Sequence, residues 1–371
     1  MSVEDARRIL QRDRQPHLFR PLKLRSIIVR NRIMMSPMCQ YSATDGLTDD
    51  WHFAHLAARA TGGAGIVCVE ATHVEPRGRI TKYCLGLWND EQRDRLARIA
   101  RFIESQGAVP AIQIGHAGRK ASVSRPWEGT LPLTAGEGGW DLLGPSAVSY
   151  SPNSPVPKAL SESAIIDMIA AFRDSTRRAR EAGFKVLELH AGHGYLFHQF
   201  LSPASNARQD KYGGPLENRM RFLLETIASV RQEWPAELPL LLRLSVTDWV
   251  PGGWDVEEAV ALCRVLKQRG DVDLIDCTSG GNDPAQRIPI HPGYQVPFAE
   301  RIRREVEIPT GAVGLISSPD AAEEIVANGR ADLVILGRMM LYDPYWPLHA
   351  ANALKAQTQK WPVQYERSNI F

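Results

Sequence analysis

The chain has 371 residues, of which 44% are hydrophobic, and its formal net charge is only +2. This length suits one large α/β barrel, and the apolar fraction is sufficient for a substantial buried core. Acidic and basic residues are interspersed along the chain. We therefore expect neither nucleic acid nor a membrane surface as its partner.

The cysteines and the N-terminal residues bear on the cellular compartment. No CxxC pair occurs among the five cysteines, which are Cys39, Cys68, Cys84, Cys263 and Cys277. A disulfide framework or a structural zinc site is therefore not expected. Charged residues interrupt the first ten positions, MSVEDARRIL, so we predict no signal peptide there. No apolar run reaches the length of a membrane span. A cytoplasmic protein is the expectation.

Short apolar runs alternate with longer helical patterns from about residue 33 onward. We predict eight strands, at residues 32–38, 65–71, 109–115, 185–190, 239–245, 273–279, 310–316 and 332–337. Most of them are continuously apolar, as strands buried on both faces are. Residues 90–107 and 161–183 have apolar side chains at helical spacing and end in glycine, and residues 317–330 resemble a short capped helix.

Eight strand-then-helix units predict a closed (β/α)8 TIM barrel, formed as a single domain over residues 1–371. The alternative, an open doubly wound sheet, would have a GxGxxG turn after its first strand, and the sequence has none there. Residues 116–160 form a long insertion, rich in Gly, Pro and Ser, between the third strand and the third helix. Such loops are usually lids or binding elements, so we expect it to cap the site. A tail over residues 357–371 follows the last unit.

Barrel enzymes build their sites at the C-terminal ends of the strands. In this chain the strand ends carry Cys39, Tyr41, Glu70, Gln113, His116, His190, His193, Arg243, Ser279, Gly314, Gly337 and Arg338. Emergence into solvent would also make strand ends polar. Arg243 and Gln113, however, interrupt apolar runs and need buried partners. The glycine turns after the seventh and eighth strands, together with Arg338, predict a phosphate site, with glycines that serve only the turns as the alternative.

The segment KVLELHAGHGYLF places His190 and His193 three residues apart, with Tyr195 close behind. A zinc site would need a third ligand, and none is evident nearby. A purely structural pair is the second alternative. We favour two imidazoles that bind a carbonyl oxygen as it gains negative charge, with Tyr195 as the proton donor.

Several motifs together resemble one known family over about residues 17–367. They are MSPMCQYSATDG, IQIGHAGRK, ELHAGHGYLFHQFLSPASNARQDKYGGPLENRMRF, RLS, TGAVG and LGR. The family is that of the Old Yellow Enzymes, FMN-dependent ene-reductases. Within it the chain resembles the bacterial, xenobiotic reductase-like branch, in which a cysteine lies beside the flavin.

The resemblance implies a tightly but non-covalently bound FMN. Its ring would be held by Ser36, Pro37, Met38, Cys39, Ala71, Gln113 and Arg243. Lys120 would lie near the ribityl chain or the ring, and Gly314, Gly337 and Arg338 would bind the phosphate. Cys39 would modulate the flavin potential, although a small buried hydrophobe is the alternative interpretation of this residue.

The same resemblance implies a ping-pong reaction with NADPH or NADH as the hydride donor. Through FMN the hydride would reach the β-carbon of an α,β-unsaturated carbonyl compound held by His190 and His193, and Tyr195 would protonate the α-carbon. Tyr41 would line the pocket for these small electrophilic alkenes, with nitro compounds and quinones as further acceptors. A homodimer or homotetramer is implied, in which Arg367 of one subunit reaches the site of its neighbour.

Three other interpretations remain open at this point. A barrel aldolase or hydrolase would need a lysine or a carboxylate-rich metal set at a strand end, and neither is clear. A larger dienoyl-CoA reductase type would need a cysteine cluster for iron and sulfur, which the sequence lacks. The third is a flavoprotein that stores flavin or senses redox state.

Overall fold

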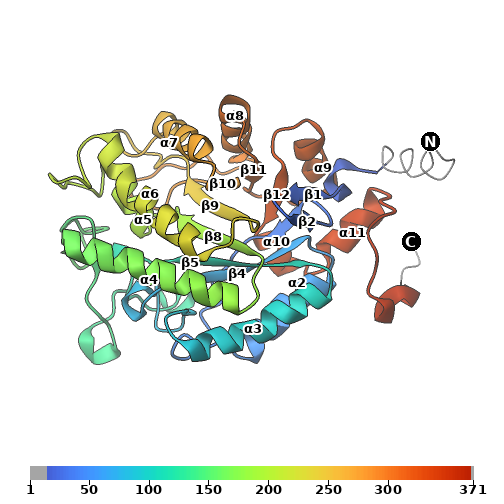
Figure 1. Cartoon of the computed structure of the whole chain (residues 1–371), viewed down its shortest axis with the longest axis horizontal. Helices are drawn as coiled ribbons and strands as arrows, with labels where there is room; N and C mark the ends of the chain where they lie inside the picture. The colour runs from blue at the N-terminus through green and yellow to red at the C-terminus, as the bar shows by residue number, and fades with distance from the viewer. Residues whose placement is uncertain (1–14, 369–371) are drawn as a thin grey trace.

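The computed structural model describes residues 15–368 (Figure 1). The charged N-terminal stretch considered above falls within residues 1–14 and, like residues 369–371, lies outside this range. Within the described chain, eight strands form the barrel: β3 (Ile33–Met35), β4 (Ile66–His73), β5 (Val109–Gly115), β8 (Val186–Ala191), β9 (Leu240–Ser245), β10 (Leu274–Thr278), β11 (Thr310–Ala312) and β12 (Leu333–Leu336).

Each barrel strand is parallel to its two neighbours, and β12 pairs with β3 to close the ring. The predicted TIM barrel is therefore confirmed. A doubly wound sheet would have left two free edges. Apolar residues dominate most of the strands and are buried over their whole length, as the unbroken hydrophobic runs indicated.

The helices pack around the outside of the barrel (Figure 1). They are α2 (Asp50–Thr61), α3 (Asp90–Ser105), α4 (Glu162–Glu181), α5 (Leu196–Leu201), α6 (Leu216–Glu233), α7 (Val256–Arg269), α8 (Val296–Val306), α9 (Pro319–Ala327), α10 (Arg338–Tyr342) and α11 (Trp346–Ala353). Side chains cap several of their N-termini. The Asn89 side chain accepts the Gln92 backbone N–H, and Ser161 accepts that of Ala164.

Two strands end several residues earlier than we predicted, and both ends have a physical reason. β3 stops at Met35, and Pro37 follows closely with no N–H to donate to a neighbouring strand. β11 stops at Ala312, because Gly314 has a φ of +124°, outside the extended region. Both segments leave the barrel as loops at its C-terminal rim.

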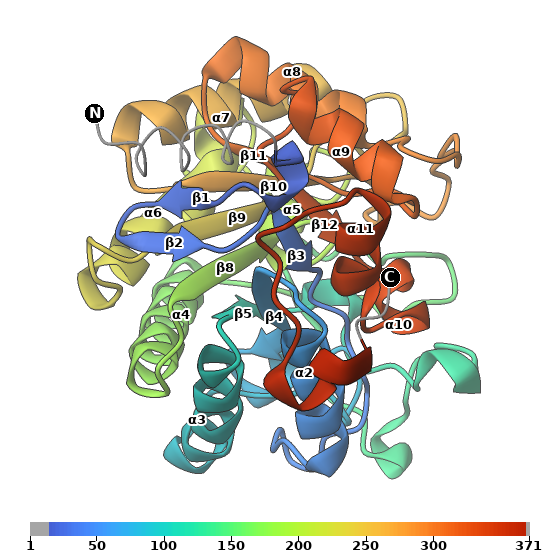
Figure 2. The same cartoon turned by 90° about the vertical axis from the view of Figure 1, so that its right-hand side faces the viewer.

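An antiparallel hairpin, β1 (Leu22–Leu24) and β2 (Ile27–Val29), lies across the barrel at the opposite end (Figure 2). Its apolar side chains form one buried cluster with residues near the starts of the barrel strands, including Met34, Ile66, Leu241 and Leu274. The hairpin therefore closes the N-terminal end of the barrel interior, and the C-terminal ends of the strands are left for a site.

The insertion over residues 116–160 is built from short elements. They are η3 (Gly118–Lys120), η4 (Pro126–Glu128), η5 (Ala135–Glu137), β6 (Leu143–Gly144) and β7 (Lys158–Ala159), and β6 pairs with β7. Arg119 ties the insertion to the rim. Its guanidinium donates to the carbonyls of Val148 and Ser149 and to that of Asn282.

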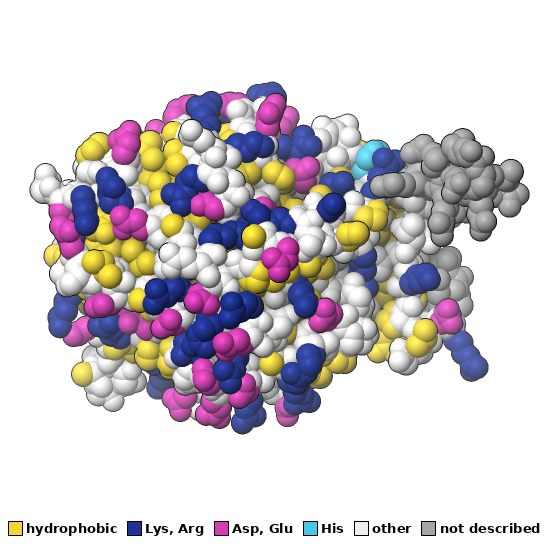
Figure 3. Space-filling view, in the orientation of Figure 1, with side chains coloured by type: hydrophobic (Ala, Val, Ile, Leu, Met, Phe, Trp, Pro, Cys, Tyr) yellow, Lys and Arg dark blue, Asp and Glu magenta, His cyan; other side chains and the backbone are white. Residues whose placement is uncertain are grey.

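The outer surface carries both signs of charge. On the face shown in Figure 3, lysine and arginine side chains alternate with aspartate and glutamate. This agrees with the small net charge of the chain. Within residues 15–368, no helix combines the length and the apolar character that crossing a membrane requires.

Candidate active site

Two adjoining cavities open at the C-terminal ends of the barrel strands. The first, of about 390 Å³, lies beside β11 and β12, and the second, of about 340 Å³, lies beside β3, β5 and β8. We call them the β11–β12 cavity and the β3–β8 cavity. Both are lined by His193, Arg243, Val313, Gly337 and Arg338. Each has the size of a small-molecule pocket, and the shared lining makes them two parts of one elongated site.

Most residues singled out in the sequence line these cavities. The β3–β8 cavity is lined by Ser36, Pro37, Met38, Cys39, Tyr41, Ala71, Gln113, His190, His193, Tyr195 and Arg243. The β11–β12 cavity adds Gly314 and, from outside the predicted set, Thr278, Tyr294, Gln295, Leu315, Ile316, Ser317, Ile335, Met339 and Tyr342. The barrel thus brings together residues that are more than 300 positions apart in the chain.

Arg243 and Gln113 find the buried partners that their positions require. The Nη1 group of Arg243 donates to Ser36 Oγ at 2.9 Å, and its Nε atom lies 3.2 Å from Asp276 Oδ2. Gln113 Nε2 donates to Glu188 Oε1 at 2.8 Å. Burial, and then the nearby Asp276, raise the pKa of Glu188 to about 8. Glu188 is therefore mainly a neutral acid at pH 7, and it anchors the Gln113 amide.

His190 and His193 face one another at the end of β8. His190 Nε2 lies 3.3 Å from His193 Nδ1, while His190 Nδ1 accepts the Gly192 N–H at 3.3 Å. The other nitrogen of His193, Nε2, lies 2.9 Å from the hydroxyl oxygen of Thr278. Burial holds the pKa of both imidazoles well below the usual range, and Arg243 acts in the same direction. Two neutral rings therefore converge on the cavity.

The loop that carries His193 is held in an unusual conformation. His193 has a φ of +55°, in the left-handed region that a histidine seldom adopts. Its N–H donates to Ser245 Oγ at 2.9 Å, and its carbonyl accepts from Lys120 Nζ at 2.8 Å. The Lys120 ammonium also donates to the Gly281 carbonyl at 2.6 Å. These bonds fix the position of the imidazole.

Lys120 lies behind the loop of His193. We expected it near the ribityl chain or the ring, yet it lines neither cavity, and its ammonium binds two backbone carbonyls. Burial, and then the charge of Arg119, lower the pKa of Lys120 to about 8. In this position Lys120 joins the loop after β8 to the loop after β10.

Tyr195 stands directly beside the histidine pair. It lines the β3–β8 cavity, and its ring centroid lies 4.9 Å from that of His190, with the rings nearly perpendicular at 84°. Burial raises the pKa of the Tyr195 phenol, with the neighbouring Cys39 and Cys84 acting in the same direction. The phenol therefore keeps its proton at neutral pH and can serve as an acid.

The loop after β3 forms the wall opposite the histidines. Cys39 lies in this wall, and its contact with Cys84, together with burial, raises the pKa of the thiol. Tyr41 follows, with its ring edge-on to that of Trp127 in the insertion at a centroid distance of 6.0 Å. The Gln40 N–H donates to Glu70 Oε2 at 2.6 Å and fixes this loop. The insertion therefore supports the cavity wall through Trp127.

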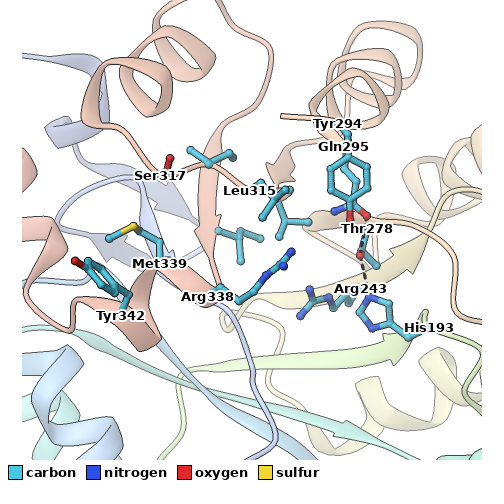
Figure 4. Close-up of a pocket in the computed structure, with 15 residues that line it drawn as sticks. His193, Arg243, Thr278, Tyr294, Gln295, Leu315, Ser317, Arg338, Met339 and Tyr342 are labelled. Carbon is cyan, nitrogen blue, oxygen red and sulfur yellow. Dashed lines mark hydrogen bonds between the residues drawn. The ribbon is translucent and has the colours of Figure 1, made fainter. Parts of the chain in front are cut away.

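The β11–β12 cavity has the features of an anion site. At Gly314 an added Cβ would lie 3.1 Å from the Gln295 backbone nitrogen, so a side chain fits poorly there. Gly337 precedes α10, and Arg338 is its first residue. Arg338 and Arg243 both point into the cavity (Figure 4). Arg338 has no hydrogen bond or ion pair with any residue in the range 15–368. A free guanidinium beside glycine backbone suits a phosphate.

The metal interpretation finds little support in the histidine geometry. His190 Nδ1 accepts a backbone N–H, and His193 Nε2 meets a hydroxyl group. In the described part of the chain, no group of three or more His, Cys, Asp or Glu side chains is arranged to hold a metal ion. Arg367 is exposed and lines neither cavity, so within one chain it is separate from the site.

Sequence reasoning missed Thr278, Tyr294 and Gln295. Thr278 ends β10 in the motif DCTSGG, and a strict count of strand ends would have included it beside Ser279. Tyr294 and Gln295 precede α8 and carry no periodic signal. They reach the site because the Gly293 N–H donates to the Gly314 carbonyl at 2.8 Å, which only the folded chain reveals.

The residues fit the FMN that the resemblance implies. The β11–β12 cavity alone is lined by Gly314, and the β3–β8 cavity alone is lined by Gln113, His190 and Tyr195. Where the two cavities adjoin, both are lined by Gly337, Arg338, Arg243 and His193. This order suits a molecule with a phosphate at one end and a polar ring system at the other, beside which a second small molecule would meet the histidines.

Comparisons with known proteins agree with this geometry. The model of the NADH:flavin oxidoreductase / NADH oxidase family matches residues 17–357. The chain is 48% identical to an NADPH dehydrogenase of Geobacillus thermodenitrificans, covering 95% of this chain and 99% of the relative. It is 45% identical to an NADPH dehydrogenase of Listeria innocua, covering 95% and 98% of the two chains.

Solved structures show the same fold. Morphinone reductase is 26% identical with a TM-score of 0.76, and the match covers 94% of this chain and 92% of that one. A 2-naphthoyl-CoA reductase is 29% identical with a TM-score of 0.82, but this chain spans only 52% of its length. The family model and the relatives both match nearly the whole length of the chain. The chain therefore belongs to the NADH:flavin oxidoreductase / NADH oxidase family, as its resemblance to the Old Yellow Enzymes indicated, and it is an FMN-dependent oxidoreductase.

Proposed function

We propose that this oxidoreductase is an ene-reductase, which uses NADPH to reduce the activated C=C bond of small α,β-unsaturated carbonyl compounds in a ping-pong reaction. The NADPH dehydrogenases to which the chain is 48% and 45% identical support this donor. NADH is the alternative donor. Nitro compounds and quinones are further acceptors of the same electrophilic class.

The convergence of two neutral imidazoles beside a protonated phenol carries the proposal. His190 Nε2 and His193 Nδ1 lie 3.3 Å apart, so one oxygen atom that binds beside the pair is within reach of both nitrogens. Hydrogen bonds to an oxygen that gains negative charge stabilise the transition state more than the ground state. The pair therefore polarises the acceptor and makes its β-carbon electrophilic.

Tyr195 then completes the reduction. Its phenol keeps its proton because burial raises its pKa. Protonation of the α-carbon by Tyr195 yields the saturated product, and the tyrosine regains its proton from solvent before the next turnover. Tyr41 lines the same cavity and would orient the acceptor.

When bound, FMN supplies the hydride relay between the nicotinamide and the β-carbon. We assign the contacts with its ring to Ser36, Pro37, Met38, Cys39, Ala71, Gln113 and Arg243, and those with its phosphate to Gly314, Gly337 and Arg338. Lys120 acts instead on the loop of His193. In this proposal Arg243 balances negative charge at the ring, and the Cys39 thiol tunes the flavin potential by direct contact.

A homodimer or homotetramer stays part of the proposal. Arg367 is exposed near the end of the described chain, so it is available to a neighbouring subunit. We assign it a role in the substrate site of that neighbour. Light scattering of the wild type and of Arg367→Ala, combined with the KM for the acceptor, tests both the assembly and this role.

The function is tested with purified protein under anaerobic conditions. We expect a yellow protein that releases FMN on denaturation, is bleached by NADPH and recovers its colour when 2-cyclohexenone is added. A parallel reduction with NADH establishes the preferred donor. Protein without flavin would refute the cofactor assignment. A bleached flavin that the enone does not reoxidise would refute the ene-reductase and favour a redox sensor.

A further inference from the structure

We infer that Thr278 is a positioning residue that selects the tautomer of His193 required to bind the acceptor oxygen. The inference deepens the proposed function and rests on it. It starts from one observation, that the hydroxyl group of Thr278 lies 2.9 Å from His193 Nε2, the ring nitrogen that faces away from His190. Thr278 is buried, with 2% of the residue exposed.

The hydrogen bonds of His190 assign its proton. Its Nδ1 atom accepts the Gly192 N–H at 3.3 Å, so in the neutral ring the proton resides on Nε2. Nε2 faces His193 Nδ1 at 3.3 Å. His190 is therefore ready to donate into the cavity, and its tautomer needs no adjustment when an oxygen arrives.

In contrast, the tautomer of His193 has to change when an oxygen binds. While its Nδ1 accepts from His190, its own proton resides on Nε2 and is donated to the Thr278 oxygen. An acceptor oxygen that binds beside the pair and accepts from both rings requires a proton on His193 Nδ1 as well as on His190 Nε2. The Nε2 atom then becomes an unprotonated, buried acceptor, which is costly unless a donor serves it.

Thr278 can supply that donor by rotation of its hydroxyl group alone. The single hydroxyl proton has two acceptors within reach, His193 Nε2 at 2.9 Å and Gln295 Oε1 at 3.3 Å. Gln295 Oε1 also accepts from Ser279 Oγ at 2.7 Å, so it stays satisfied when Thr278 turns away. Without an acceptor the proton points to Gln295, and with one it points to His193. No heavy atom has to move.

A cationic His193 would also donate from both nitrogens, but its surroundings oppose it. Besides burial, the charges of Arg243 and Lys120 hold the pKa of His193 well below the usual range. The neutral Nδ1–H form is therefore the form that can bind an oxygen at this position, and Thr278 is the side chain placed to stabilise it.

The test compares Thr278→Val, which removes the hydroxyl at nearly constant shape, with Thr278→Ser, which keeps it. Thr226→Val is the matched control, because it removes the hydroxyl of an equally buried threonine on α6, which donates to the Phe222 carbonyl away from the site. FMN-loaded proteins with 15N-labelled histidine are studied by long-range 1H–15N NMR with and without 4-nitrophenolate, whose oxygen represents the acceptor oxygen. A His193→Asn variant identifies the signals.

We expect wild type and Thr278→Ser to change from Nε2–H to Nδ1–H at His193 when the phenolate binds. In the phenolate complex of Thr278→Val, we expect the Nδ1–H form of His193 no longer to be the main tautomer. There the phenolate Kd and the rate of flavin reoxidation by 2-cyclohexenone should each worsen about 5- to 100-fold, as expected for loss of one hydrogen bond to a buried acceptor. Thr226→Val should stay within about threefold of wild type in both measurements, because its hydroxyl has no part in the hydrogen bonds of His193.

An unchanged Nδ1–H form in the Thr278→Val complex overturns the inference, even if affinity falls, since Thr278 would then act only through packing. The proposed function is unaffected by that outcome. A wild-type protein that neither binds the phenolate nor is reoxidised by the enone refutes the proposed function, and the inference with it.

Discussion

The two ends of the elongated site differ in how their polar groups are used. At the end of β8, every nitrogen of the histidine pair has a partner, and Ser245 and Lys120 hold the backbone of His193. Beside β12, the Arg338 guanidinium has no hydrogen bond or ion pair with the described residues. One end is held by the protein itself, whereas the other leaves a charge for a ligand to neutralise.

This difference matches the demands of the two tasks. Catalysis needs donors whose orientation does not change when charge develops, and a network of hydrogen bonds provides that orientation in advance. Tight binding of an anionic tail needs a cation that gains a partner only on binding. Loss of a network member should therefore slow a chemical step, and loss of Arg338 should release the cofactor.

Tyr195→Phe should give the largest effect. Without a proton donor beside His190, we expect reoxidation of the flavin by 2-cyclohexenone to slow about 10²- to 10⁴-fold. Reduction by NADPH should stay nearly at the wild-type rate. Stopped-flow absorbance of the flavin measures both half-reactions separately. An equal loss in both would count against Tyr195 as the proton donor.

Arg338→Ala tests the other end of the site. Loss of a charge-assisted bond should weaken FMN binding about 10- to 100-fold. Protein that is then saturated with FMN should reduce the enone at nearly the wild-type rate. Fluorescence titration of the flavin-free protein with FMN gives the Kd. Arg304→Ala, which removes an exposed arginine on α8, serves as the control. Unchanged FMN affinity in Arg338→Ala would remove this residue from the phosphate site.

Lys120→Met separates the two roles considered for this lysine. Because the ammonium binds the His193 and Gly281 carbonyls, we expect enone reduction to slow about tenfold while the FMN content is unchanged. The thermal midpoint is measured alongside the rate. Lys158→Met, which removes only an exposed ion pair with Asp141, is the control. Weaker FMN binding, with enone reduction at the wild-type rate once the protein is saturated with FMN, would instead support a lysine in contact with the cofactor.

Glu188→Gln should have the smallest effect on the reaction, and its effect on stability should depend on pH. The folded state raises the pKa of Glu188 from 4.5 to about 8, so between these values the folded chain binds more protons than the unfolded chain. The contribution of Glu188 to stability therefore falls as pH rises through this range. Relative to wild type, the stability of the variant should rise by about 3 kcal/mol between pH 5 and pH 8 in denaturant titrations with excess FMN. A difference that does not vary with pH would show that Glu188 is ionised.

The sequence predicted the barrel and the rim because both follow from local signals. Continuous apolar runs identified the strands, and a polar residue at the end of such a run, as at His190 or Arg243, identified the rim. The ends of β3 and β11 were missed by several residues, since the change at Pro37 and Gly314 depends on how each loop leaves the barrel.

Contacts between loops were beyond the reach of sequence reasoning. Lys120 binds backbone carbonyls, and a carbonyl has no residue type that a pattern could reveal. The hydrogen bond between Thr278 and His193 joins residues 85 positions apart, and which of the two residues donates depends on the tautomer of His193. Family resemblance supplies the names of site residues, but it does not supply the hydrogen bonds that orient them.

The contact between Tyr41 and Trp127 places part of the substrate-pocket wall in a different segment of the chain from the catalytic residues. Trp127 belongs to the insertion and is 64% exposed, whereas the histidines, Tyr195 and Arg243 are held by the barrel and its buried network. Replacement of Trp127 by smaller or larger residues reshapes the wall behind Tyr41 and leaves the barrel strands untouched. For protein engineering, the part of the insertion around Trp127, which leaves out Arg119 and Lys120, is therefore a segment in which the range of acceptors can be diversified at little risk to the reaction itself.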